Sequence, residues 1–225
     1  MEFDPDTLSL DERYKILSGC VVPRPIAFVS TLSAAGAPNL APYSQFTFAS
    51  IFPPALLFCV GRKRDRSEKD TVVNARPRDA GGTGEFVVNV AIEDYARDVS
   101  IASVDMAAGV SEWESTSLHP VPSVKVAPCR IAEAPIAFEC RTMQVVPVGA
   151  FGVVIGRIIH IHIRDDVIDE RYHIDHDAFN AIGRMAGHNY VRIHDRFEVK
   201  DGFDAKIFEE IDRELRAGIP APAAR

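Results

Sequence analysis

The sequence is poor in cysteine, and its four cysteines are widely spaced at Cys20, Cys59, Cys129 and Cys140. No Cys-x-x-Cys pair is present, which excludes the common zinc, iron–sulfur and dithiol motifs and favours reduced structural thiols. No apolar run is long enough for a transmembrane helix, and the first ten residues carry three acids. We therefore expect neither a signal peptide nor a membrane span, and a cytoplasmic location by default.

Positive charge is scarce as well, because 25 lysines and arginines face 32 aspartates and glutamates, giving a formal net charge of -7. Such a field repels phosphate at long range, so we expect no binding to nucleic acid or to an anionic membrane. The composition, with 47% hydrophobic and 25% charged residues, is typical of a folded protein. Residues 1–225 are predicted to form one domain that ends in a frayed tail over 218–225.

Motifs of several common enzyme classes are missing. The sequence has no Gly-x-Ser-x-Gly elbow, and Ser30, Ser44 and His119 cannot be assembled into a triad from their order. The glycine-rich run Gly81–Gly84 precedes a predicted strand instead of joining a strand to a helix. It is therefore interpreted as a loop, and not as a dinucleotide or phosphate motif.

Four histidines lie close together in the sequence, at His160, His162, His173 and His176. Their spacing matches no standard zinc motif, so we expect no metal site. A metal-binding or purely structural β-barrel that uses these histidines remains an alternative.

The clearest periodicity is that of two long strands, Ile136–Val148 and Phe151–Ile163, separated only by Gly149 and Ala150. This pattern predicts a long antiparallel hairpin. In the second strand the expected faces are Phe151, Val153, Ile155, Ile159, Ile161 and Ile163 on one side, and Gly152, Gly156, His160 and His162 on the other.

Shorter segments complete a mainly β pattern. Strands are predicted at Pro25–Leu32, Asn39–Tyr43, Ala55–Val60 and Glu85–Val90, the first two forming a hairpin. Helices are predicted at Asp94–Ala107 and Phe203–Arg216, both packing against the strands. Mostly antiparallel strands with few helices favour a closed barrel over a doubly wound sheet.

A locally basic segment, Gly61–Thr71, holds five lysines and arginines in this acidic chain. Ser67 and Asp70 have the spacing of a capping box, which predicts a helix that starts here and continues through Ala75. The free N–H groups of a helix start and the nearby cations favour a terminal phosphate. The alternative is a solvated loop followed by a capped helix.

The segment Pro38–Phe46 carries two prolines, Pro38 and Pro42, in a predicted strand. Because proline removes a ladder donor, we expect an irregular strand that turns its backbone towards a ligand. The alternative is an edge strand shaped by proline, with buried aromatic side chains.

An ordered series of segments resembles the flavin reductase-like, FMN-binding split-barrel family. The segments are Arg24–Thr31, Asn39–Phe46, Lys69–Asn74, Glu85–Asn89, Ser111–Glu114, Cys140, Gly152–His162 and Gly183–Tyr190. The similarity covers about residues 12–195, and the ordered series is more specific than any single piece. It implies an antiparallel Greek-key split β-barrel with a few peripheral helices, forming a homodimer with FMN near the subunit interface.

The resemblance also implies the residues that hold FMN. Those expected along the ring and the ribityl chain are Ser30, Thr31, Ala41, Pro42, Tyr43, Ser44, Gln45 and Phe46. Those expected at the phosphate are Lys69, Asp70 and Thr71 with Arg62, while Arg184 and Tyr190 border the pocket. Exposed amides of the proline-containing strand would bond the ring's carbonyls and N5, with Tyr43 or Phe46 beside an aromatic face.

The implied activity is hydride transfer from NADH or NADPH to FMN, with the reduced flavin or its electrons passing to a partner such as a monooxygenase. No side-chain general base is needed, so no catalytic residue is assigned. An FMN-binding electron-transfer protein or flavin carrier without a pyridine-nucleotide site shares every motif and stays open as an alternative.

Overall fold

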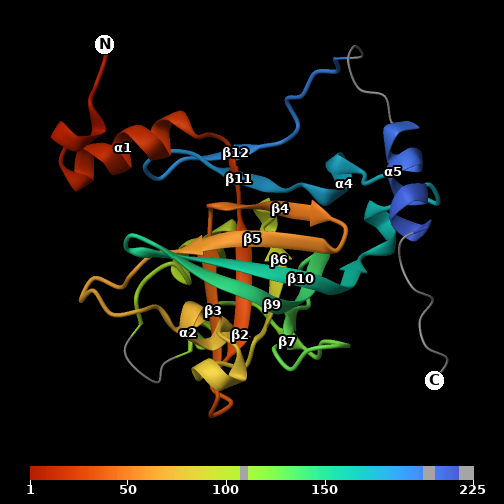
Figure 1. Cartoon of the computed structure of the whole chain (residues 1–225), viewed down its shortest axis with the longest axis horizontal. Coiled ribbons are helices and arrows are strands. Elements are labelled where there is room, and N and C mark those ends of the chain that lie inside the picture. Colours follow the sequence, from red (N-terminus) through yellow and green to blue (C-terminus); the bar gives the residue numbers. More distant parts are fainter. Residues whose placement is uncertain (107–110, 200–205, 218–225) are drawn as a thin grey trace. The chain divides into compact units, whose positions relative to one another are not determined.

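The computed structural model describes residues 1–106, 111–199 and 206–217 (Figure 1). They fall into two compact units, Met1–His194 and Asp195–Arg225. In the second unit a helix, α5, spans Lys206–Ala217. Residues 203–205 of the predicted C-terminal helix and the predicted tail lie outside the described residues. No helix in the described ranges is long and apolar enough to cross a membrane.

The first unit is built on a seven-stranded antiparallel sheet with the order β3-β2-β6-β9-β10-β5-β4. The strands are β2 (Ala27–Leu32), β3 (Pro38–Tyr43), β4 (Phe46–Ile51), β5 (Pro54–Val60), β6 (Glu85–Val90), β9 (Ile136–Val148) and β10 (Phe151–Ile163). The ring of Tyr43 on β3 stacks on Phe58 of β5 at 5.4 Å. The sheet therefore curls until β3 and β5 pack together, although no ladder joins them in the described chain.

The long hairpin β9–β10 has the predicted bounds, but the predicted faces of β10 were wrong. Register shifts interrupt the pairing between Ile155 and Gly156 and between Ile158 and His160. Gly156 lies inside, where an added Cβ would be 2.2 Å from Phe86. His160 pairs with Glu139, next to the inward-facing Cys140, and so faces outwards. A bulge inserts one residue and exchanges the faces of the strand.

The helices differ more from the prediction. Helix α1 (Leu10–Cys20), which was not predicted, begins at a capping box formed by Ser9 and Glu12. Helix α3 (Ala96–Ile101) is shorter than expected, and residue 107 of the predicted helix lies outside the described ranges. Tyr95, Val99 and Ala102 of this segment are buried in one apolar cluster.

Helix α2 (Asp70–Ala75) starts where the basic segment ends. The predicted capping box between Ser67 and Asp70 was wrong, because the Ser67 hydroxyl donates to Asp65 at 2.5 Å and Lys69 occupies the N-cap. Asp65 lies two residues before Ser67 and reaches it within the loop. It thus removes the hydroxyl from the helix end.

Short elements complete the unit. They are β1 (Arg24–Pro25), β7 (Pro120–Val121), β8 (Arg130–Ile131), α4 (His176–Phe179), β11 (Ile182–Arg184), β12 (Tyr190–Arg192) and 3-10 turns at Pro5–Thr7, Arg78–Ala80, Glu93–Tyr95, Glu112–Ser115 and Asp165–Val167. In a small sheet of order β1-β11-β12, Arg184 of β11 pairs with Arg24 of β1, just before β2 begins. The predicted loop at Gly81–Gly84 is confirmed.

Candidate functional site

Strand β3 is regular and lies at the edge of the sheet, so the prediction of an irregular strand was wrong. It pairs with β2 without a register shift. The Leu40 amide points away from β2 and donates to the Glu112 carboxylate at 3.2 Å. Because alternate residues of an edge strand share this direction, Pro38 and Pro42 also lie where no ladder donor is needed. The prolines fit the alternative of a proline-shaped edge strand.

A small cavity of about 40 Å³ opens at the inner face of β3. We call it the Lys69 cavity. Its lining residues are Asn39, Ala41, Tyr43, Lys63, Lys69, Asp70, Thr71, Ala102, Val104, Asp105, Met106 and Glu112. Strand β3, the start of α2 and two loops thus meet in one place, and three predicted phosphate-site residues lie beside the predicted strand.

Both ammonium groups of the Lys69 cavity are paired. Lys69 Nζ lies 3.1 Å from Asp105 Oδ1, and Lys63 Nζ lies 2.9 Å from Asp70 Oδ2. Burial disfavours the Asp105 carboxylate, but hydrogen bonds from Lys69 and the Arg64 amide outweigh it and hold the pKa of Asp105 below its usual value. A ligand anion therefore competes with Asp105 for the Lys69 ammonium group.

Glu112 adds a third carboxylate, bonded to the β3 edge through Leu40. Burial raises the pKa of the Glu112 carboxyl, and nearby Asp70 raises it further. The cavity thus holds three acids against two lysines. A dianion placed here gains from the lysines and is opposed by Glu112.

Tyr43 supplies an unused hydrogen-bond donor. Its side chain is only 6% exposed and its ring packs on Phe58 in the barrel core. Its hydroxyl is buried beside Thr71 and lines the Lys69 cavity, and its own O–H has no acceptor in the described structure. Burial raises the pKa of Tyr43 far above its usual value, so the hydroxyl stays protonated. A buried donor without a partner costs about 1–3 kcal/mol, which a ligand acceptor would offset.

A buried polar network fixes the wall of this cavity. The Asn39 side-chain amide donates to Thr31 at 3.2 Å and to Thr71 at 2.9 Å, and Asn74 donates to Thr31 at 3.0 Å. These bonds attach α2 to β2 and β3. Ser30 donates to the Cys129 carbonyl, so both predicted β2 residues have internal partners and line neither cavity of this site.

A larger cavity of about 430 Å³ lies at the outer face of β3. We call it the Arg184 cavity. Its lining residues are Ile26, Pro42, Ser44, Val99, Ser100, Ser103, Val104, Arg184, His188 and Tyr190. Val104 borders this cavity and the Lys69 cavity alike, so the two are neighbours.

Arg184 is held in place at this second cavity. Its guanidinium lies 4.7 Å from the centre of the Tyr190 ring and donates to the carbonyls of Gly187 and Asn189. A cation over an aromatic face is stabilised by the ring's quadrupole. The structure brings the predicted pair Arg184 and Tyr190 together with Pro42 and Ser44.

Arg24 is a buried residue to which the sequence analysis gave no role. Its guanidinium donates to the carbonyls of Ser18 at 2.6 Å, Val21 at 2.7 Å and Met185 at 3.1 Å, and to Ser44 Oγ at 3.3 Å. It thereby ties the end of α1 and the β11 segment to Ser44. Arg24 stands at the start of the quoted segment Arg24–Thr31, but its partner Met185 lies too far along the chain to be inferred.

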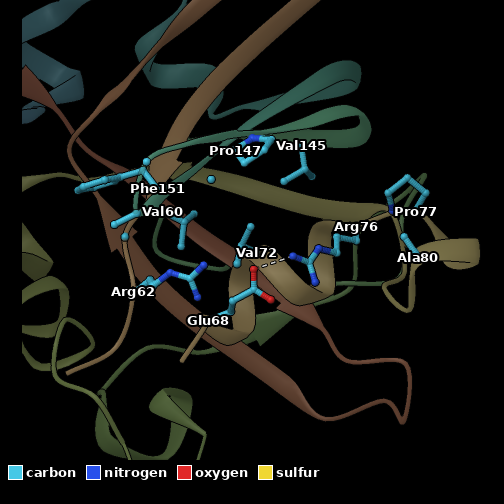
Figure 2. Close-up of a pocket in the computed structure, with 14 residues that line it drawn as sticks. Val60, Arg62, Glu68, Val72, Arg76, Pro77, Ala80, Val145, Pro147 and Phe151 are labelled. Atoms are coloured by element: carbon cyan, nitrogen blue, oxygen red, sulfur yellow. Dashed lines mark hydrogen bonds and ion pairs between the residues drawn. The ribbon is translucent and has the colours of Figure 1, made fainter. Parts of the chain in front are cut away.

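The remaining predicted residues lie elsewhere. Gln45 lines an apolar groove beside α1, and Phe46 packs against the barrel core. Arg62 faces a different cavity, together with Glu68 and Arg76 (Figure 2). The Lys69 and Arg184 cavities therefore contain nine of the predicted residues: Ala41, Pro42, Tyr43, Ser44, Lys69, Asp70, Thr71, Arg184 and Tyr190.

A model of the flavin reductase like domain matches residues 18–183. The chain belongs to this family. A crystal structure of nitrilotriacetate monooxygenase component B from Bacillus cereus is 31% identical, with a TM-score of 0.82 over 88% of this chain and 98% of that one. The 2-nitrobenzoate 2-nitroreductase of Pseudomonas fluorescens is 30% identical, with a TM-score of 0.79 over 90% and 96%.

A further relative is YwrF, an uncharacterized protein of Bacillus subtilis. It is 38% identical over 202 residues, which are 87% of this chain and 96% of the relative. The predicted family and split-barrel fold are confirmed. Among the described residues, no three His, Cys, Asp or Glu side chains are grouped to hold a metal ion.

The polar groups of the two cavities fit a flavin mononucleotide. The Lys69 cavity offers two ammonium groups, both paired with aspartates, and the Tyr43 hydroxyl; these donors suit a phosphate. The adjoining Arg184 cavity has the apolar walls and the serine hydroxyls that a planar heterocycle requires. Along β3 itself the free edge offers one amide, at Leu40, and Glu112 already accepts from it.

Proposed function

We propose that this chain is an FMN-dependent flavin reductase that accepts hydride from NADH or NADPH. The observation that carries the proposal is the pair of neighbouring cavities on the two faces of β3, one with lysines and the other with the Arg184–Tyr190 pair. A phosphate-bearing chain and a planar ring need these two environments side by side. Membership of the flavin reductase-like family supports the same assignment.

In this proposal Lys69 binds the flavin phosphate after exchanging its contact with Asp105, and Lys63 adds a second positive charge. The Tyr43 hydroxyl donates to the phosphate or to a ribityl oxygen. Thr31, Asn39 and Thr71 act indirectly, because their network holds α2 against β3. Bound FMN would supply the redox chemistry, since no side chain of the protein transfers hydride.

The outer cavity would hold the ring and the nicotinamide donor. Pro42 and Ser44 form its floor, and Arg24 keeps Ser44 in place. Arg184, oriented by two carbonyls, presents a fixed positive charge to negative charge on the bound cofactor or nucleotide. Its role is electrostatic, and no side-chain acid or base is assigned.

We further propose that the chain works as a homodimer. An apolar groove of about 500 Å³ runs between α1 and the end of the β9–β10 hairpin. Tyr14 and Leu17 of α1 and Val148 and Phe151 of the hairpin line it and are exposed. Exposed apolar side chains grouped in this way favour a protein interface. Sedimentation of the wild type should show a dimer, and Leu17→Ser should dissociate it. Lys15→Ser, on the same helix but outside the groove, should leave the dimer intact. A monomeric wild type would refute the proposed dimer.

The natural acceptor is proposed to be a partner monooxygenase, in keeping with the similarity to a monooxygenase component B. Purified protein should carry a yellow flavin that chromatography identifies as FMN. Anaerobic addition of NADH or NADPH should bleach it. If dithionite bleaches the flavin but neither NADH nor NADPH does, the reductase is refuted and an electron-transfer protein is favoured. A protein that neither carries nor takes up flavin would refute the whole proposal.

A further inference from the structure

A third cavity, of about 360 Å³, is shown in Figure 2. We call it the Arg62 cavity. It opens between the loop that leaves β5, the far side of α2 and the tip of the β9–β10 hairpin. It shares no lining residue with the Lys69 or Arg184 cavity.

One side of this cavity is charged. Arg62 and Arg76 approach Glu68 from opposite directions (Figure 2), and Arg76 Nη2 lies 2.6 Å from Glu68 Oε1. Arg62 also donates to the Arg66 carbonyl at 3.2 Å. Two guanidinium groups against one carboxylate leave one formal positive charge, in a protein whose net charge is -7. Any attraction for an anion is therefore local.

The other side of the cavity is apolar. Val145, Pro147 and Phe151 of the hairpin face Val72 of α2 across it (Figure 2). The volume lies at the lower end of the range of small-molecule pockets. An apolar body placed here would be removed from water, while its charged end reached the arginines.

We propose that the Arg62 cavity binds a small carboxylate with an apolar ring or branched body. A guanidinium presents paired N–H groups that match the two oxygens of a carboxylate, and charge-assisted bonds of this kind are stronger than neutral ones. The ligand carboxylate competes with Glu68 for Arg76, and at Arg62 it meets a guanidinium that donates to the Arg66 carbonyl. The site is independent of the proposed flavin activity.

Calorimetry on the full-length protein saturated with FMN tests the site with phenylacetate, phenylacetamide and phenethylamine. These probes share one ring and differ in the charge of the end group. Phenylacetate should bind about tenfold more tightly than the neutral amide, and the amine should not bind. Saturating FMN keeps the flavin site out of the measurement. Equal binding of acid and amide, or no binding of the acid, overturns the proposal.

Two substitutions with opposite expected effects on phenylacetate binding make the test specific. Arg76→Gln should weaken phenylacetate binding about tenfold, and Glu68→Gln should strengthen it, because the competing carboxylate is gone. Arg78→Gln, two residues further on and outside the cavity, is the matched control and should change nothing. If Arg76→Gln does not fold, Glu68→Gln still decides. Unchanged or weaker binding by Glu68→Gln overturns the assignment.

Discussion

Replacement of Lys69 by alanine tests the proposed phosphate contact. In the free protein Lys69 is bonded to Asp105 at 3.1 Å, and both side chains are about one-quarter exposed. Such a partly screened pair contributes up to about 1 kcal/mol to stability, so Lys69→Ala should fold normally. A charge-assisted hydrogen bond to phosphate is worth about 1–3 kcal/mol, which predicts FMN binding weaker by about fivefold to 150-fold.

Asp105→Asn gives the opposite expectation. Because it removes the internal competitor for Lys69, FMN should bind more tightly than to the wild type. In the double variant Lys69→Ala/Asp105→Asn most of this gain in FMN affinity should disappear, because Lys69 is no longer there to be released. Fluorescence quenching of FMN by the flavin-free protein measures all four affinities of the cycle.

Lys15→Ala is the matched control, since it also breaks a lysine–aspartate pair, with Asp11 on exposed α1. It should leave FMN affinity unchanged. The reasoning fails if Lys69→Ala binds FMN as the wild type does. It also fails if Asp105→Asn weakens FMN binding.

Three other substitutions follow from the same structure. Gly156→Ala would place a Cβ 2.2 Å from Phe86 and should destabilise the protein by about 1–3 kcal/mol in urea unfolding. Gly19→Ala, which has open space in α1, should stabilise it by up to about 1 kcal/mol. Urea midpoints equal to that of the wild type would contradict both. Tyr43→Phe removes the unpaired hydroxyl, so stability should hold or rise while FMN affinity falls; unchanged affinity would show that the hydroxyl does not contact flavin. Glu112→Gln should stabilise the protein at pH 7, because the raised pKa of Glu112 means that its ionised form is disfavoured in the folded state. The gain in stability should shrink as the pH falls through that raised pKa towards 4.5, and it should vanish at lower pH. A gain that persists at pH 3 would rule out this explanation.

The sequence was most informative where local pattern alone decides structure. The bounds of β6, β9 and β10 were predicted because alternating apolar residues and turn residues specify them without help from the rest of the chain. Strand β4 was missed because a register shift between Phe48 and Ser50 interrupts the alternation of its apolar residues. The histidine face of β10 was wrong because a bulge depends on the partner strand.

Part of the site could be predicted in the same way. Tyr43 and Lys69 meet in one cavity as the motif series implied. The partners that set their chemistry could not be found, because Asp105 and Glu112 are brought to the cavity by loops far along the chain. The resemblance grouped Arg62 with Lys69 at the phosphate, but the two side chains line different cavities.

The placement of Pro38 and Pro42 on the open border of the barrel also affects how the molecule meets its neighbours. An unpaired border strand normally invites a strand from another chain to add to it, which leads to aggregation. Here two of the outward positions have no hydrogen to donate and the third is already bonded to Glu112. A strand from another chain therefore finds no row of free N–H donors along β3. The edge of β3 stays accessible to a small ligand.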